Sequence, residues 1–582
     1  MRKRAVLAAL AAFICFTGAS AAVEMKEKWV IYSANFEDDT SVDRFIRVVE
    51  QARAAGCTHV FVDDPQFGFI NEMPLHYWNN IKRARAAVEK SGLTVAPGLF
   101  PFGYSGAYLH LDPNVAAGLP VKDAPFIVKG GVASPDPKSA PGVANAGFDE
   151  ADKNGPVGWK IFDPAGKNMD LDKHMKHSGA ASLCMGAFNT LPKTANGNCY
   201  VTQRLKVKPF QYYRLTFWTL TQNFAAGESG VRFESGGGRR RHCYTNMAIK
   251  SDESWAMHEA TFNTLEADEI NMSVGAWNAA GGTVWFDDLK IEPAGLANVL
   301  RTEMKPLTIT GADGSVTYVE GKDFRPVVDP KLGKAPVRDA YYRPFPYDVW
   351  HKGPSIAFIP GSHVKDGDTV LVSFYHPAVL YDDQVVAALD EPKVFEFMDA
   401  QAAGLSKAWG AKNYFMRYNE VRVGGWEVHP DGSKPAPGQI LAANVARGVE
   451  IIRKYVPDAR IYTWSDMFDP KHNAYSFDER KQFYCLVNGN WNGSWEGLPK
   501  DVVVMNWNGT DRAAASLKWF AGLGYKQVIA GYYDGNPADN VAHWMTAARG
   551  VPDIIGMMYT TWAAKYNDLP AFFKAAGGSR GK

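Results

Sequence analysis

An amide and a carboxylate stand side by side where a short apolar run of the chain ends. Residues 413–426 read N-Y-F-M-R-Y-N-E-V-R-V-G-G-W, and the apolar part stops at Asn419 and Glu420, with Arg422 two residues later. Buried strands that present polar groups at their C-terminal ends are typical of parallel α/β barrels, whose catalytic residues lie there. We therefore predict that Glu420 is a catalytic acid. The alternative is a surface residue that begins a loop and pairs with Arg422.

Polar and aromatic residues follow the other apolar runs in the same way. They are Asp63 and Asp64, Trp464 and Asp466, Trp507, Tyr533 and Asp534, and Trp562. Aromatic walls with a few carboxylates are typical of a sugar pocket, because the apolar faces of sugar rings stack on aromatic side chains. Cleavage of a glycosidic bond needs a protonated acid for the departing oxygen and a group that stabilises the oxocarbenium-like centre from the other face. Glu420 can be that acid where the aromatic residues desolvate it enough to keep it protonated.

Some of these residues have a second interpretation. Asp63 and Asp64 are predicted to bind sugar hydroxyls, although one could be an inverting base and the pair could be structural. His376 is a candidate substrate contact, but its Tyr-His-Pro context is equally a turn. Trp507 could contribute to the outer core of the barrel instead of the pocket.

The metal-ligating residue types are present but sparsely placed. Asp466, Asp469 and His472 have the spacing D-x-x-D-x-x-H, which can hold a divalent metal but more often caps a helix or binds hydroxyls, so we predict no metal there. The six cysteines form no C-x-x-C pair, which argues against a zinc ribbon or a disulfide scaffold. Cys184 and Cys199 could form a disulfide, and we favour free thiols.

The first 22 residues have the pattern of an export signal. Basic residues at 2–4 precede an apolar run at 5–16, and residues 19–21 have the small-x-small form of a cleavage site. We expect an exported chain, periplasmic or secreted, that begins near Ala22. No later apolar run reaches the roughly 20 residues of a membrane-spanning helix. Only 239–241 forms a basic cluster, so neither nucleic acid nor a membrane is an expected partner.

Length and composition require more than one globular unit. A chain of 582 residues is too long for one ordinary domain. Its 21% charged and 46% hydrophobic residues are typical of globular proteins. Its 17 Trp and 25 Tyr are compatible with sugar stacking, although large cores also use Trp.

Strands and helices alternate in two separate parts of the chain. The first part, 23–110, has predicted strands at 28–36, 59–62 and 93–100 and predicted helices at 41–55 and 77–90. The second part, 381–582, has predicted strands at 413–418, 460–464, 502–505, 527–530 and 554–558, and predicted helices at 391–409, 438–455, 514–522 and 539–549, the last capped by Asp539. Three and five strands make the eight of a (β/α)8 TIM barrel, an α/β fold, interrupted after its third strand. A strand at 369–374 would be a ninth, and we assign it to a β-rich return segment at 297–380.

The interrupting segment, 140–296, has short alternating strands with turn residues between them. These are predicted at 200–207, 213–219, 257–262 and 283–291 and indicate a β-sandwich. The motifs Asn145-Ala146-Gly147-Phe148-Asp149, Gly158-Trp159, His177-Ser178-Gly179 and Val284-Trp285-Phe286-Asp287-Asp288-Leu289 resemble those of jelly-roll carbohydrate-binding modules. The resemblance implies a galactose-binding-like jelly roll that binds glycan or acts as a spacer. Asp149 and Asp287 are either ligands of a structural calcium or turn and cap carboxylates.

The barrel part resembles family 20 glycoside hydrolases, the β-N-acetylhexosaminidases. The resemblance lies in the x-Glu pair after the fourth strand, Trp464-Ser465-Asp466 after the fifth, Tyr533-Asp534 after the seventh and Trp562 after the eighth. It implies substrate-assisted retaining hydrolysis without a cofactor, in which the 2-acetamido oxygen of the substrate is the nucleophile. On this resemblance Glu420 is the acid/base, Asn419 orients the acetamide, Tyr533 donates to its carbonyl, and Trp507 and Trp562 are pocket walls.

Asn419 departs from that family, which has aspartate at this position. Asn-Glu pairs also resemble endo-acting family 85 enzymes and the large retaining-glycosidase clan, whose glutamate nucleophile at the seventh strand is missing here. The predicted function is therefore a glycoside hydrolase acting on a terminal bond of an oligosaccharide, polysaccharide or glycoconjugate. Two alternatives stay open: a glycosidase of another sugar that pairs Glu420 with Asp466 or Asp534, and a non-catalytic glycan-binding protein on a degenerate barrel.

Overall fold

The computed structural model describes residues 25–164, 166–235, 240–243, 247, 249–333, 347–380, 384–475 and 486–577. The predicted export signal lies outside these residues, so export stays a prediction. Within the described ranges, no helix has both the length and the apolar character required to cross a bilayer.

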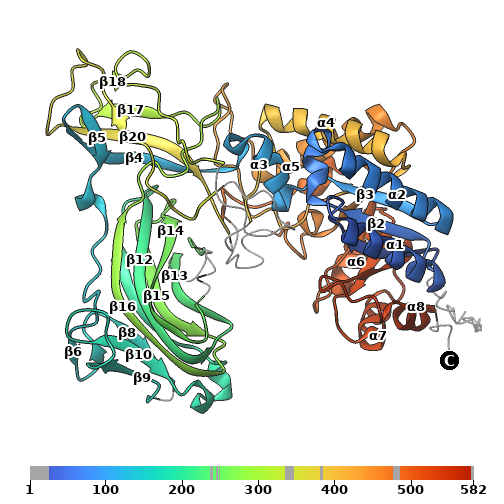
Figure 1. The fold of residues 1–582 in the computed structure, drawn as a ribbon, viewed down its shortest axis with the longest axis horizontal. Helices are drawn as coiled ribbons and strands as arrows, with labels where there is room; N and C mark the ends of the chain where they lie inside the picture. The colour runs from blue at the N-terminus through green and yellow to red at the C-terminus, as the bar shows by residue number, and fades with distance from the viewer. Residues whose placement is uncertain are drawn as a thin grey trace, which may run out of the picture.

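Eight parallel strands close into a barrel in the order in which they occur along the chain, which confirms the predicted fold (Figure 1). The strands are β1 (Glu27–Ser33), β2 (His59–Asp63), β3 (Thr94–Leu99), β21 (Asn413–Met416), β23 (Arg460–Trp464), β25 (Val503–Asn506), β26 (Gln527–Tyr532) and β27 (Ile554–Thr560). The helices of the barrel are α1 (Asp39–Ala54), α2 (Leu75–Ser91), α4 (Pro392–Trp409), α5 (Pro437–Tyr455), α6 (Ala513–Gly522), α7 (Pro537–Ala547) and α8 (Leu569–Gly577). A short helix, α3 (Gly106–Leu111), follows β3. Pairing of β27 with β1 closes the ring.

Alternate residues of each strand divide between two apolar clusters. In β1, Trp29 and Ile31 belong to the cluster inside the barrel, whereas Val30 and Tyr32 belong to the cluster between the strands and the helices. This follows from the two-residue period of a strand, which points successive side chains to opposite faces. The strands therefore bury apolar side chains on both faces.

The start of α7 differs from the prediction. Asn536, not Asp539, is the N-cap, and its side chain accepts hydrogen bonds from the backbone N–H groups of Ala538 and Asp539 at 2.9 and 3.2 Å. Pro537 takes the first helical position, where its missing N–H costs no intrahelical hydrogen bond.

The interrupting segment is a β-sandwich, as predicted, made of a five-stranded and a four-stranded antiparallel sheet around one apolar core. The five-stranded sheet has the order β14 (Glu253–Asn263), β12 (Tyr212–Ala225), β16 (Gly281–Pro293), β10 (Ser182–Gly186), β9 (Met169–Asp172). The four-stranded sheet has the order β13 (Glu228–Ser235), β15 (Glu269–Trp277), β11 (Cys199–Lys206), β8 (Lys160–Phe162). Cys184 and Cys199 are free thiols, as we favoured.

The carboxylates proposed for calcium accept backbone hydrogen bonds in the sandwich loops. Asp149 accepts from the N–H groups of Ala180 and Ala181, and Asp287 accepts from those of His177 and Ser178. These bonds are those of turn and cap carboxylates, and calcium binding stays a prediction.

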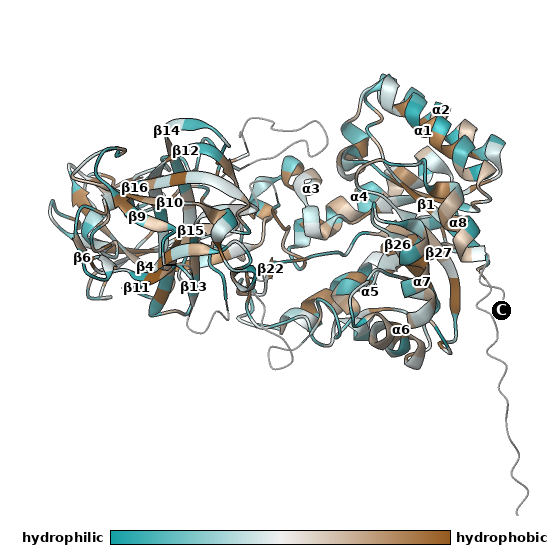
Figure 2. Ribbon diagram, turned by 90° about the horizontal axis from the view of Figure 1, so that it is seen from below, coloured by the Kyte–Doolittle hydropathy of each residue, from teal (hydrophilic) through white to brown (hydrophobic). Residues whose placement is uncertain are grey.

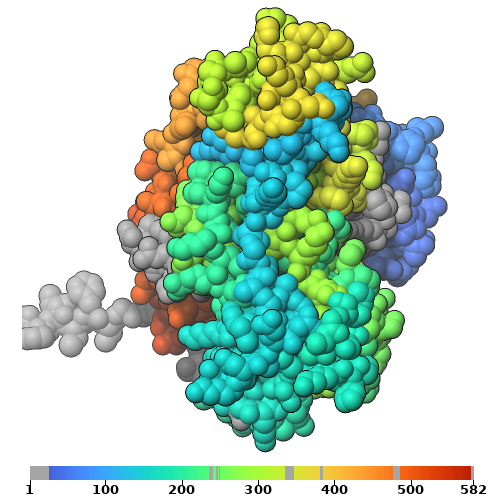
Figure 3. Space-filling model, turned by 90° about the vertical axis from the view of Figure 1, so that its left-hand side faces the viewer, coloured from blue at the N-terminus to red at the C-terminus, as the bar shows by residue number. Residues whose placement is uncertain are grey.

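A six-stranded sheet stands between the sandwich and the barrel along the chain. Its order is β18 (Thr317–Tyr318), β17 (Thr308–Gly311), β20 (Thr369–Pro377), β4 (Gly118–Lys129), β5 (Val132–Pro135), β19 (Ile356–Ala357). The assignment of 369–374 to the return segment instead of the barrel is confirmed, because β20 pairs with β4. The strands β4 and β5 were not predicted. Figure 3 views the end of the molecule that this sheet forms together with the sandwich. The later strands of the sheet are lime and yellow there, β4 and β5 are blue, and the first part of the sandwich is teal.

Candidate active site

An open cleft lies at the C-terminal end of the barrel strands. Its lining consists of Tyr104, Arg417, Asn419, Glu420, Trp464, Trp507, Tyr533 and Trp562. Its empty volume, which includes the open mouth, is about 890 Å³, within the range of small-molecule sites. The cleft brings together six of the residues predicted from strand ends, and Tyr104 and Arg417 join them.

Both carboxylate oxygens of Glu420 accept hydrogen bonds from the protein. The Tyr104 hydroxyl donates to Oε2 at 2.5 Å, and the Arg422 guanidinium donates to Oε1 at 2.8 Å. Burial and the charge of Glu420 raise the pKa of Tyr104, so its hydroxyl keeps its proton. The Glu420 side chain is 24% exposed and therefore reaches the cleft from within this pair of contacts.

The backbone around Glu420 is held in an unusual conformation. Glu420 has φ 55°, in the left-handed region that non-glycine residues seldom adopt. Its N–H donates to Asp466 Oδ2 at 2.8 Å, and its carbonyl accepts from Gln384 Nε2 at 3.1 Å. On the other side, a Cβ on Gly103 would stand 1.6 Å from the Asn419 carbonyl oxygen. The segment thus rests directly on the Gly103 backbone.

Asp466 supports the cleft but does not line it. It is fully buried, and its carboxylate accepts from the Glu420 N–H, from Asn473 Nδ2 at 2.9 Å and from Trp507 Nε1 at 3.0 Å. Burial raises the pKa of Asp466 to about 7, although these hydrogen bonds lower it in part. The carboxylate therefore positions Glu420 and Trp507, and its place in the structure does not fit the alternative of a second catalytic carboxylate facing the sugar.

Three consecutive residues, the last of β26 and the two that follow it, have positive φ values. They are Tyr532 at 79°, Tyr533 at 49° and Asp534 at 60°. Asp534 accepts from the Thr561 hydroxyl at 2.5 Å and from the Trp562 N–H at 2.9 Å. Partial burial alone would raise the pKa of Asp534, but these hydrogen bonds and that of Ala563 hold it below its ordinary value. Asp534 therefore ties two loops together and does not line the cleft as a second carboxylate.

The aromatic residues of the cleft differ in how firmly they are held. Trp464 is 4% exposed and packs in the barrel interior, whereas Trp562 is 58% exposed at the rim. Trp507 and Tyr533 lie nearly parallel, with ring centroids 6.4 Å apart. Desolvation raises the pKa of Tyr533, and the charges of Asp466 and Glu420 raise it further, so its phenol is neutral and can donate a hydrogen bond.

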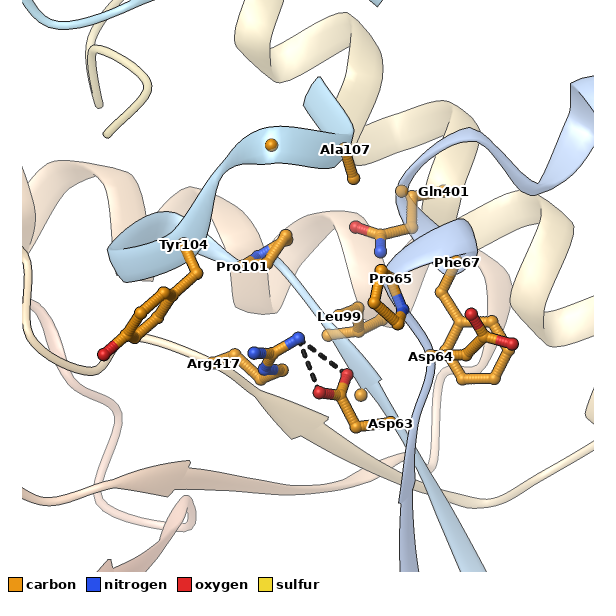
Figure 4. Close-up of a pocket in the computed structure, with 13 residues that line it drawn as sticks. Asp63, Asp64, Pro65, Phe67, Leu99, Pro101, Tyr104, Ala107, Gln401 and Arg417 are labelled. Carbon is orange, nitrogen blue, oxygen red and sulfur yellow. Dashed lines mark hydrogen bonds and ion pairs between the residues drawn. The ribbon is translucent and has the colours of Figure 1, made fainter. Parts of the chain in front are cut away.

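A smaller hollow adjoins the cleft and shares Tyr104 and Arg417 with it (Figure 4). Arg417 Nη1 lies 2.7 Å from each carboxylate oxygen of Asp63, at the end of β2. The Tyr104 hydroxyl points away from Asp63, toward the side of Glu420. The ion pair of Asp63 and Arg417 offers donors and acceptors for hydroxyl groups, in line with the substrate-binding role predicted for Asp63.

Asp64 has a different environment from its neighbour. It is 1% exposed, and its carboxylate accepts from the N–H groups of Phe36 at 2.8 Å and Gln66 at 2.9 Å and from the Tyr77 hydroxyl at 3.2 Å. It caps the 3-10 helix η1 (Pro65–Glu72). These bonds give Asp64 a structural role in the described chain, although the residue borders the smaller hollow.

We expect Asp64 to make the stability of the barrel depend on pH. Burial raises its pKa from 3.8 to about 7, so between these values the folded chain keeps a proton that the unfolded chain has released. This contribution to stability is full below pH 4 and is lost as the pH rises through about 7. Asp64→Asn does not titrate, so the urea midpoint of the wild type should fall relative to that of the variant between pH 4 and pH 7. A constant difference would contradict the assignment, and the exposed Asp511→Asn is the control.

The structure corrects the predictions for His376 and Arg422. His376 is 2% exposed and stacks on Tyr212 of the sandwich at 3.6 Å. Its Nδ1–H donates to the Pro377 carbonyl and its Nε2 accepts from Asn263, so it forms part of an interface between β-rich units and does not border the cleft. Arg422 is buried behind Glu420 and also donates to Gln384, so it positions the carboxylate instead of binding substrate.

The residues of the D-x-x-D-x-x-H motif belong to the interior. Asp469 is buried and accepts hydrogen bonds from Ser516 at 2.5 Å and Asn508 at 3.4 Å. His472 lies edge-on to Trp507 at 4.2 Å. In the part of the chain that the structure describes, no group of three or more His, Cys, Asp or Glu residues has the arrangement of a metal site.

Tyr104, Arg417, Gln384 and Gly103 were not predicted as site residues. Arg417 comes directly after β21, and Tyr104 lies in the loop that follows β3, so both stand at the C-terminal ends of barrel strands, the position that selected the other residues. Gly103 and Gln384 have no side-chain chemistry that would single them out, because their roles depend on contacts between distant parts of the chain.

Comparisons with known proteins give no family for this chain. No protein-family model matches it, and no curated protein matches it in sequence. Among solved structures, the chitobiase of Flavobacterium johnsoniae aligns with 92% of this chain at 8% identity and a TM-score of 0.32. The rhamnosidase of Novosphingobium sp. PP1Y aligns with 94% at 9% identity and a TM-score of 0.31. This chain covers 44% and 56% of those two proteins, about half of their length.

A structure described as CBM4 aligns with 26% of this chain, over 99% of its own length, at 15% identity and a TM-score of 0.20. Identities and TM-scores as low as these assign neither a family nor a substrate.

Proposed function

We propose that this protein is a glycoside hydrolase whose catalytic acid/base is Glu420. The observation that supports the proposal most directly is that Glu420 is the one carboxylate among the eight residues lining the cleft, which also include three tryptophans, Trp464, Trp507 and Trp562. Indole walls around a single carboxylate suit a sugar ring whose glycosidic oxygen needs a proton. The Tyr104 hydroxyl can donate to ionised Glu420 and accept from protonated Glu420, so the contact is compatible with both states.

The position of the other carboxylates supports a substrate-assisted mechanism. Asp466 and Asp534 are bonded to the scaffold, so neither is available in the cleft as a nucleophile or a base. A reaction in which the 2-acetamido oxygen of the substrate attacks the anomeric carbon needs no second carboxylate of the protein. Asn419 and the neutral Tyr533, which line the cleft, can hold the acetamide by its N–H and its carbonyl. We therefore propose a retaining β-N-acetylhexosaminidase. On the resemblance and the N-terminal pattern described above, we also propose that it is exo-acting and exported from the cell.

A panel of aryl glycosides tests this proposal. We expect hydrolysis of N-acetylhexosaminides and no measurable hydrolysis of matched hexosides that lack the acetamide. A thiazoline mimic of the oxazolinium intermediate should inhibit strongly. Hydrolysis confined to sugars without the acetamide would exclude substrate assistance, and glycan affinity without hydrolysis of any member would favour the non-catalytic alternative.

A further inference from the structure

The segment that carries Glu420 is anchored at its far end by the inserted sandwich. Six residues after Glu420, Trp426 is 6% exposed. The guanidinium carbon of Arg240 lies 5.5 Å from the centroid of its ring, and Phe210 packs edge-on against the ring at 6.3 Å. Arg240 and Phe210 both belong to the sandwich, so the contact joins two units that are distant in sequence.

Arg240 also bonds to the strand next to this segment. Its side chain is 12% exposed, and Nη2 donates to the Val487 carbonyl at 3.2 Å. Val487 belongs to β24 (Leu486–Val487), which pairs with β22 (Val423–Gly424) in a two-stranded sheet. Figure 2 places β22 between the sandwich and the barrel. One side chain of the sandwich thus contacts both the end of the Glu420 segment and its partner strand.

The two-stranded sheet connects these contacts to the catalytic carboxylate. The Leu486 N–H donates to the Arg422 carbonyl at 2.6 Å, and the Asn488 N–H donates to the Gly424 carbonyl at 3.0 Å. Trp426 Nε1 in turn donates to the Leu486 carbonyl at 2.9 Å. Because Arg422 bonds to Glu420 Oε1, a displacement of the sheet moves the guanidinium that orients the carboxylate.

The sandwich makes this contact with a packed tip and not with a single side chain. Leu265 of the sandwich is fully buried and belongs to the apolar cluster of the barrel. The backbone N–H of Phe210 donates to the Leu265 carbonyl at 2.6 Å, and the Lys122 ammonium lies 3.6 Å from the Phe210 ring centroid. We call Phe210, Arg240 and Leu265 the sandwich tip.

We propose that the sandwich tip is part of the active-site scaffold and that Arg240 is a positioning residue for Glu420. Burial of the guanidinium over an indole and against a carbonyl makes the contact stronger than an exposed one. The domain then supports the reaction from behind the catalytic segment, whether or not it binds glycan itself. The expected effect of Arg240 on catalysis rests on the function proposed above. Its expected effect on the position of the two-stranded sheet does not.

Hydrogen exchange in the full chain tests the structural part. In Arg240→Gln we expect the amides of Leu486 and Asn488 to exchange at least about fivefold faster than in the wild type. Their acceptors, the carbonyls of Arg422 and Gly424, lie in the segment that Arg240 holds through Trp426. Arg240→Lys, which keeps the charge, should restore most of the protection. Arg241→Gln is the matched control. Arg241 is next to Arg240 in sequence, but its guanidinium bonds to Glu234 within the sandwich. Unchanged exchange in Arg240→Gln would overturn the proposal whatever the activity.

Kinetics on the best substrate of the glycoside panel test the catalytic part. We expect Arg240→Gln to lower kcat roughly 3- to 30-fold with KM nearly unchanged, and Arg240→Lys to recover most of the loss. A rise in KM alone would overturn the positioning role. Faster exchange in Arg240→Gln together with a wild type that hydrolyses no glycoside would refute the proposed function and leave the scaffold role supported.

Discussion

The Glu420→Gln protein is expected to keep its fold and to lose roughly 10³-fold in kcat. Glutamine matches glutamate in shape, and its oxygen can still accept from Arg422 while its amide donates to the Tyr104 hydroxyl. The variant therefore removes the titrating proton and little else. KM should change little, because the indoles that we propose to bind the sugar are untouched.

The leaving group of the substrate identifies the role of Glu420. An alkoxide needs a proton from the enzyme more than a phenolate does, so the loss in Glu420→Gln should be larger for an alkyl glycoside than for an aryl glycoside of the same sugar. Equal losses for both would contradict the acid role. Glu450→Gln is the control, because Glu450 is exposed on α5 and pairs only with Arg447 among the contacts described. Less than a tenfold loss in Glu420→Gln on the alkyl glycoside would refute its assignment as the catalytic acid.

Gly103→Ala is expected to lower kcat roughly 100-fold although Gly103 itself bears no reactive group. A Cβ at this position would stand 1.6 Å from the Asn419 carbonyl oxygen, far inside van der Waals contact. Either the Asn419 and Glu420 backbone or the loop after β3 must therefore shift, and a shift of about 1 Å misplaces the carboxylate. We expect the free energy of unfolding to fall by about 1–3 kcal/mol as well.

Kinetics and urea unfolding of Gly103→Ala measure these two effects separately. Gly522→Ala is the matched control, since no atom lies within 4 Å of a Cβ added to Gly522 at the end of α6. It should keep full activity and be as stable as the wild type or slightly more so, because alanine favours the helix. Near-ultraviolet circular dichroism checks that Gly103→Ala is folded. Full activity in a folded Gly103→Ala would show that the exact placement of the Glu420 segment is unimportant.

The barrel could be predicted from the sequence because each of its strands and helices has a local sequence signal. Each strand is a short apolar run, each helix has its own period and caps, and the polar residues that end the strands meet at one end of the barrel by the geometry of the fold. Glu420, Trp507 and Tyr533 could therefore be placed in one cleft from the printed chain alone. The N-cap of α7 was misplaced by three residues, because Asn536 and Asp539 are both good capping residues.

The roles of individual carboxylates could not be predicted in this way. Asp466 and Glu420 both follow strands. Asp466 is fully buried and accepts hydrogen bonds from three donors, whereas Glu420 is exposed to the cleft. The difference depends on partners such as Tyr104, which lies 316 residues from Glu420 in the chain. His376 was misassigned for the same reason, because the sandwich that buries it contributes Tyr212 and Asn263 from another unit.

The insertion after β3 also determines how the barrel must form. β3 pairs with β21, with Gly98 opposite Phe415 and Leu99 opposite Met416. Two neighbouring strands of the barrel are therefore separated along the chain by the whole sandwich and the six-stranded sheet. During synthesis the first three strands emerge with the edge of β3 unpaired, and an unpaired parallel edge is prone to aggregation. Closure of so long a loop is entropically costly, and prior folding of the inserted units reduces that cost by bringing their ends together. We therefore expect closure of the barrel, and with it formation of the cleft, to depend on prior folding of the inserted units.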